Sequence, residues 1–152
     1  MNSRKKLFTH TLVLVFMSLT TAESRAQSAA QEGQLKHGRY LVQRVGLCGD
    51  CHTPHDDHGQ PIEAKTLRGA GLTFKPLGSV PNWVEYAPPL VGLLGFTDEQ
   101  MITFLTTGKD PSGKSPRPPM PPYRFDKRDA AAVVAYLRSL GNQGKAEPRE
   151  PK

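Results

Sequence analysis

Cysteine is scarce in this chain, and a long uninterrupted apolar run is missing. Only two of the 152 residues are cysteine, Cys48 and Cys51. A disulfide between them would close too small a loop to remove much entropy from the unfolded chain, so it would hardly stabilise a domain of this size. The most apolar stretch, residues 7–19, is short and interrupted by polar residues, and no other segment approaches the length that spans a bilayer. An uncleaved membrane anchor is therefore the minority interpretation.

The N-terminal residues are arranged as in a secretory signal peptide, with a basic start, an apolar region and small residues at the end. Arg4, Lys5 and Lys6 form a basic start, residues 7–19 match the apolar region in length, and small residues end at Ala26. The sequence predicts a signal peptide over residues 1–26 and an exported, periplasmic mature protein. No cysteine stands at the cleavage site, which argues against a lipid anchor.

A clustered basic patch is also missing. The whole chain has a formal net charge of +6, but removal of the signal takes four of the 20 basic and one of the 14 acidic residues, which leaves 16 and 13 and a net charge of +3. The remaining basic residues are spread along the sequence. Nucleic-acid binding thereby loses its main support.

The pattern C-x-x-C-H is present once, at Cys48, Cys51 and His52. It is the attachment signature of a c-type haem, in which both thiols form thioethers and the histidine is the proximal iron ligand. A thioredoxin-like site is a poor alternative, because no β-branched strand precedes the motif. A non-haem zinc module using these residues with His55 and His58 stays open, although zinc fingers separate their cysteine and histidine pairs more widely.

Three helices are predicted in the 126 residues that remain after the signal. The first spans about residues 34–45. The second begins at Thr97 with a capping-box pattern to Gln100 and ends at Gly108, and the third has Asp126 as N-cap and ends at Gly141. Helical spacing predicts which residues of each helix face inward. In the first helix these are Gly38, Leu41, Val42 and Val45; in the second, Met101, Ile102 and Leu105; and in the third, Ala130, Val133, Val134, Leu137 and Leu140.

More than forty residues between the motif and Thr97 show no periodicity. So long a loop is unusual in a compact domain unless something other than secondary structure organises it, and a haem edge would do so. Six apolar or aromatic side chains of this stretch either line such a pocket or pack in an ordinary core, and packing is the simpler interpretation for each one. They are Trp83, Tyr86, Leu90, Leu93, Leu94 and Phe96.

Two methionines follow residue 26, and their surroundings differ. Met101 lies on the apolar face of a helix, where a thioether usually fills space. Met120 is flanked by two prolines on each side. Each proline fixes φ, so this stiff segment loses little entropy when it holds a weakly donating sulfur in place. Met120 is therefore the candidate distal ligand, with a Pro-rich recognition segment as the alternative.

These residues resemble a class I monohaem cytochrome c, and are similar to cytochrome domains that serve bacterial periplasmic dehydrogenases. The likeness runs from residues 37–41 through C-x-x-C-H, residues 87–90 and Met120-Pro121 to residues 130–140. It implies an all-α fold of three main helices and long loops around one covalent haem c. The cytochrome domain would span residues 27–141, with a polar, disordered tail over residues 142–152. The first and last helices would cross near Gly38 and Tyr136.

The resemblance also implies a function. Cys48, Cys51, His52 and Met120 would bind the haem, with His52 and Met120 on the iron. The protein would be an electron carrier, and no enzyme, between a periplasmic dehydrogenase and a respiratory acceptor such as an oxidase or another cytochrome. The open alternatives are a haem peroxidase or gas sensor with a displaceable distal ligand, and the zinc module.

Overall fold

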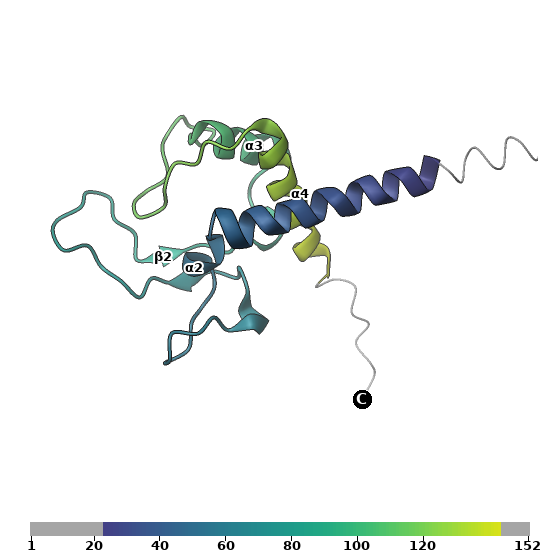
Figure 1. Cartoon of the computed structure of the whole chain (residues 1–152). Coiled ribbons are helices and arrows are strands. Elements are labelled where there is room, and N and C mark those ends of the chain that lie inside the picture. Colours follow the sequence, from purple (N-terminus) through teal and green to yellow (C-terminus); the bar gives the residue numbers. More distant parts are fainter. Residues whose placement is uncertain (1–22, 144–152) are drawn as a thin grey trace, which may run out of the picture. The chain divides into compact units, whose positions relative to one another are not determined.

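The computed structural model describes residues 23–143 (Figure 1). Residues 1–22 of the expected signal peptide and residues 144–152 of the expected tail lie outside this range. The chain divides into two compact units, Met1–Gly33 and Gln34–Lys152. In the first unit, residues 23–33 are helical. The signal cleavage site and the domain limits at residues 27 and 141 stay predictions.

The second unit is built mainly from helices, which confirms the all-α prediction. Residues 34–40 are α-helical, and the later elements are η1 (Leu41–Val45), α2 (Cys48–His52), η2 (Glu63–Lys65), β1 (Ala70–Gly71), β2 (Tyr86–Ala87), η3 (Val91–Leu93), α3 (Asp98–Thr107) and α4 (Lys127–Gln143). The β1–β2 pair is antiparallel. Its strands were not predicted, because two residues are too few to show alternation. Among residues 23–143, no helix has the length and apolar composition that crossing a membrane requires.

The first predicted helix is confirmed, but its last turn is wider than an α-helical turn. In η1 the amide of Gly46 donates to the carbonyl oxygen of Leu41 at 2.7 Å, five residues back. Leu41 and Val42 are buried as expected, whereas Val45 is 50% exposed. Its expected inward position was wrong, because each residue of a π turn advances less about the helix axis and Val45 is not carried round to the buried face.

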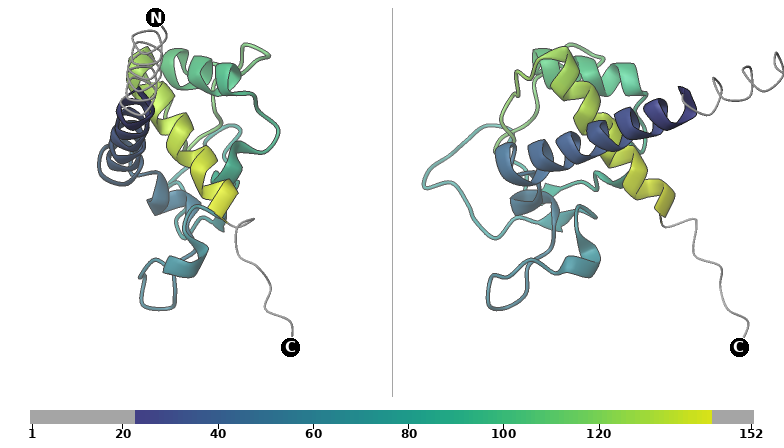
Figure 2. Two further views of the ribbon diagram at one scale, coloured as in Figure 1. Left: turned by 90° about the vertical axis from the view of Figure 1, so that its right-hand side faces the viewer. Right: turned by 45° about the vertical axis from the view of Figure 1, so that its right-hand side comes forward.

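This helix meets α4 at Gly38. A Cβ at Gly38 would lie 2.0 Å from the carbonyl oxygen of Ala132 and 2.8 Å from the Cβ of Tyr136. The two backbones therefore touch without an intervening side chain, and Figure 2 shows the blue part of this helix, from residue 34 on, crossing the yellow-green α4. The expected crossing near Gly38 and Tyr136 is confirmed.

The predicted ends of α3 are confirmed. The Thr97 hydroxyl accepts from the Gln100 amide at 3.2 Å, and the Gln100 side chain accepts from the Thr97 amide at 2.9 Å, which completes a capping box. Gly108 ends the helix in the left-handed conformation at φ 66°. Met101 and Leu105 face inward and are buried.

Replacing Thr97 with alanine is expected to lower the free energy of unfolding by about 1 kcal/mol, because the amide of Gln100 loses its capping acceptor. Urea unfolding of the intact protein, followed by circular dichroism, measures the change. Thr97→Ser keeps the hydroxyl and is the matched control, expected to stay near wild type. Equal losses in both variants would contradict a role for the cap.

The last helix starts as predicted and ends later. The carboxylate of Asp126 accepts from the amide of Asp129 at 2.8 Å, as an N-cap should. The expected end at Gly141 was wrong, since α4 continues to Gln143. Gly141 instead allows close packing, because a Cβ there would lie 2.7 Å from the Cα of Gly92 in η3.

The long stretch before α3 is ordered by polar contacts that sequence periodicity does not reveal. The guanidinium of Arg138, on α4, donates to the carboxylate of Asp98 at 2.7 Å and to the carbonyl oxygens of Gly92 and Phe96. One side chain thereby joins α4, the start of α3 and the η3 loop. Leu94, in the same loop, is 78% exposed, so the expectation that it packs was wrong.

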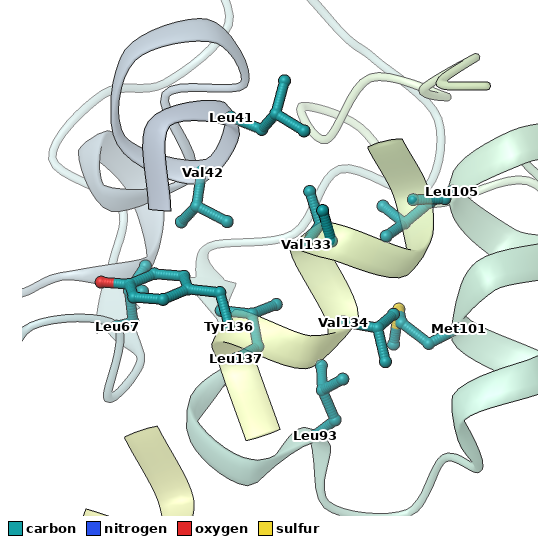
Figure 3. Close-up of a cluster of buried hydrophobic side chains, with 12 residues drawn as sticks. Leu41, Val42, Leu67, Leu93, Met101, Leu105, Val133, Val134, Tyr136 and Leu137 are labelled. Carbon is teal, nitrogen blue, oxygen red and sulfur yellow. The ribbon is translucent and has the colours of Figure 1, made fainter. Parts of the chain in front are cut away.

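The core gathers side chains from the first helix, the loops, α3 and α4 (Figure 3). Its members are Leu41, Val42, Leu67, Leu93, Met101, Leu105, Ala130, Ala132, Val133, Val134, Tyr136 and Leu137. The inward face of α4 is thus confirmed, and Met101 fills space as predicted. Cys48 is among the partly buried side chains packed against this cluster, so the C-x-x-C-H segment borders the core.

Candidate cofactor site

The motif forms its own short helix, α2, directly after the first helix. Leu47 precedes it in the left-handed conformation at φ 49°, which turns the chain out of η1. Thr53 follows in an extended conformation, and its amide donates to the carbonyl oxygen of Gly49 at 3.0 Å. One helical turn therefore carries Cys48, Cys51 and His52 together, as the spacing requires.

The ring of His52 is held by a hydrogen bond to the backbone of a distant segment. Its Nδ1 lies 2.6 Å from the carbonyl oxygen of Pro88. A carbonyl only accepts, so Nδ1 carries the proton and Nε2 keeps a free lone pair. The residue is 6% exposed, and burial lowers its pKa although the hydrogen bond to Pro88 opposes this shift. The imidazole is accordingly neutral, which is the state that binds metal.

The carbonyl of Pro88 is held in place through Gly69. The Gly69 amide donates to the carbonyl oxygen of His52 at 2.8 Å. With φ 85°, Gly69 lets the chain pass so close that a Cβ would lie 2.9 Å from the amide nitrogen of Pro89. Ala70 then pairs with Ala87 in the β1–β2 ladder, beside α2 in Figure 1. Residues 87–90, which the resemblance includes, thus carry the carbonyl that contacts His52 and the strand residue that pairs with Ala70.

Neither thiol has the lowered pKa of a reactive cysteine. Burial raises the pKa of Cys48 to about 11, helped by the charges of Cys51 and Asp50. Burial also raises the pKa of Cys51. Reactive cysteines need a thiolate, which a lowered pKa provides. The zinc alternative loses support because, within residues 23–143, no three His, Cys, Asp or Glu side chains gather as a metal site.

The histidines of the zinc alternative lie in a turn after α2. His55 pairs with Pro61 in an isolated bridge. The amide of the exposed His58 donates to the carboxylate of Asp56 at 2.9 Å, as does that of Gln60. Asp56 thus organises a turn at the surface, where His58 is exposed.

Met120 lies on a separate loop and is half-buried. Its amide donates to the carbonyl oxygen of Arg117 at 3.1 Å, and the amide of Val84 donates to the carbonyl oxygen of Pro118 at 2.9 Å. On the other side of Met120, the Tyr123 hydroxyl donates to the carbonyl oxygen of Gly46. The loop therefore lies beside the segment that leads into α2.

Trp83 offers an observation that tests whether a haem fits. Its indole N–H is buried and has no acceptor in the described part of the chain, while its ring meets Phe74 edge-on at 5.8 Å. A buried donor left unpaired costs about 1–3 kcal/mol, so an acceptor is expected there. A haem propionate is a suitable acceptor. Simple packing, the sequence interpretation of Trp83, does not account for this N–H.

The chain was compared with known proteins. The family model described as cytochrome c matches residues 35–141. The fructose dehydrogenase cytochrome subunit of Gluconobacter japonicus is 29% identical over 108 residues, which are 68% of this chain and 21% of that protein. The alcohol dehydrogenase (quinone) cytochrome c subunit of Gluconacetobacter polyoxogenes is 34% identical over 117 residues, or 70% of this chain and 24% of that protein.

A third relative is a diheme cytochrome c-type protein of Cereibacter sphaeroides, 27% identical over 110 residues, or 69% of this chain and 35% of that protein. The chain thus spans between about a fifth and a third of the length of these relatives. Residues 35–141, which the family model matches, contain α2, Pro88, Met120 and most of α4.

Proposed function

The chain belongs to the cytochrome c family of electron-transfer proteins that bind haem covalently, and from this membership we propose that it carries one haem c with His52 and Met120 as iron ligands. The single C-x-x-C-H supports one haem, because the chain has no further cysteine to tether a second. The observation that carries the proposal is the neutral, buried His52, whose Nδ1 donates to Pro88 and whose Nε2 keeps its lone pair.

Each residue of the site has a distinct task in this proposal. The sulfurs of Cys48 and Cys51 would hold the porphyrin by thioether bonds, and His52 would be an iron ligand. Met120 would supply the second iron ligand from its proline-stiffened loop. The indole N–H of Trp83 would donate to a propionate, which would satisfy the buried donor.

The bound haem supplies a one-electron couple between ferric and ferrous iron. The protein has to keep both ligands in both oxidation states, so that little rearranges when an electron moves. His52 is held by Pro88. The Met120 loop is held by the backbone bonds from Met120 to Arg117 and from Val84 to Pro118, and by the bond of the Tyr123 hydroxyl to Gly46. A thioether ligand favours ferrous iron and raises the reduction potential.

The electron donor in this proposal is a dehydrogenase and the acceptor is a respiratory oxidase or another cytochrome. The names of the two dehydrogenase relatives support the donor, since both are cytochrome subunits of such enzymes. The sequence of residues 1–26 supports a periplasmic location.

Mass spectrometry under denaturing conditions tests the cofactor. The exported protein is expected to have the mass of the polypeptide from residue 27 plus one haem, and to titrate as a single one-electron couple. The control is the double variant Cys48→Ser with Cys51→Ser, which is expected to lose the covalent haem. A wild-type protein with the bare polypeptide mass, or with two haems, would contradict the proposal.

A further inference from the structure

We propose that Tyr123 is a positioning residue that fastens the Met120 loop to the haem-attachment segment, an inference that rests on the proposed function because it takes Met120 as the distal ligand. The Tyr123 hydroxyl donates to the carbonyl oxygen of Gly46. Tyr123 stands three residues after Met120, and Gly46 two residues before Cys48. This bond therefore joins the segment of the proposed distal ligand to the segment that would tether the haem.

The ring of Tyr123 is held independently of that bond. It stacks on Phe125 with a centroid distance of 5.2 Å and an interplanar angle of 10°. The Phe125 amide donates to the carbonyl oxygen of Leu105, in α3, at 3.1 Å. Both rings also pack against the core. The hydroxyl is thus presented to Gly46 by a ring with little freedom, and burial raises the pKa of Tyr123 to about 12, so it keeps its proton.

Gly46 gives the bond a firm partner. Its amide donates to Leu41 at 2.7 Å, whereas the carbonyl of a residue at a helix end has no partner within the helix. A Cβ at Gly46 would lie 3.3 Å from the sulfur of Cys48 and 3.7 Å from the ring of Phe125. The accepting carbonyl is therefore part of the segment that packs directly on the tethering sulfur.

The two prolines between Met120 and Tyr123 connect the bond to the ligand. Pro121 and Pro122 each fix φ, so the short segment bends little. A Met120 sulfur that served as distal ligand would be carried by this stiff segment, and the bond of Tyr123 to Gly46 opposes any swing of the segment away from α2. Loss of the bond should raise the population in which Met120 is detached.

Imidazole competition on the ferric holoprotein measures that population, because imidazole takes the iron position that Met120 vacates. Tyr123→Phe keeps the stacked ring and removes only the donor. Its apparent Kd for imidazole, followed by visible absorption, is expected to fall about fivefold to tenfold below the wild-type value. Tyr40→Phe is the matched control, because Tyr40 is 56% exposed, and it should match wild type.

Met120→Ala, measured in the same titration, separates this inference from the proposed function. If Met120→Ala binds imidazole much more tightly than wild type while Tyr123→Phe binds as wild type, the fastening role is wrong and the distal ligand stands. A lower denaturation midpoint of Tyr123→Phe with an unchanged imidazole Kd would likewise overturn the inference. If Met120→Ala matches wild type, both the distal assignment and the inference fall.

Discussion

Replacing Met120 with alanine is expected to convert the ferric protein from low spin to high spin and to let the ferrous protein bind carbon monoxide. The variant loses the thioether and keeps His52, so the iron has an open distal position. The loop itself should survive, because its contacts through Arg117, Val84 and Tyr123 are made by other atoms. Visible absorption and electron paramagnetic resonance detect the change of spin state.

Met101 provides the control, since it is the other methionine after residue 26. It is 8% exposed and belongs to the core. Met101→Leu is expected to cost less than about 1.5 kcal/mol of stability and to leave the spectrum unchanged. A Met120→Ala protein that stays low spin and rejects carbon monoxide would show that another group, such as His55 or His58, is the distal ligand.

A side chain as small as a methyl group at Gly38 is expected to destabilise the fold severely. The added Cβ of Gly38→Ala would lie 2.0 Å from the carbonyl oxygen of Ala132 and 2.6 Å from its carbonyl carbon. These are backbone atoms of α4, which cannot turn aside as a flexible side chain does. Overpacking of this kind costs about 1–3 kcal/mol and occasionally more, so we expect a loss of about 3 kcal/mol in denaturant unfolding.

Gly33→Ala is the matched control for that variant. Gly33 is also helical, and a Cβ there would meet nothing within 4 Å. Because alanine favours a helix over glycine by about 1 kcal/mol, this substitution should be neutral or slightly stabilising. If both variants unfold alike, the close crossing of the first helix and α4 does not contribute to stability.

Local chemistry made the helices predictable, and contacts between distant segments explain where the prediction was wrong. Thr97 and Asp126 cap their own helices, and each accepts a hydrogen bond from an amide only three residues later. Such local contacts can be predicted from sequence. Glycine commonly ends a helix, which is why Gly141 was expected to do so. Its actual role is close packing against Gly92, which lies on another element. Val45 follows the helical pattern, but the π turn that exposes it has no comparable sequence signal.

The same distinction applies to the site. Cys48, Cys51 and His52 share one pentapeptide, so the sequence predicts them directly, and their roles with that of Met120 stay predictions. The hydrogen bond from His52 to Pro88 joins residues 36 positions apart, and that from Tyr123 to Gly46 joins residues 77 apart. Neither follows from spacing. The single tryptophan was a usable signal, because the N–H of an indole that becomes buried needs an acceptor.

The crossing at Gly38 also bears on the order in which the protein is assembled. The first helix packs against α4, the last element of the described chain, and contacts between segments so distant in sequence carry a high entropic cost of loop closure. During synthesis α2 and its two thiols precede α4 by more than seventy residues. The turn that carries the haem-attachment motif is therefore made before the partner of the first helix exists.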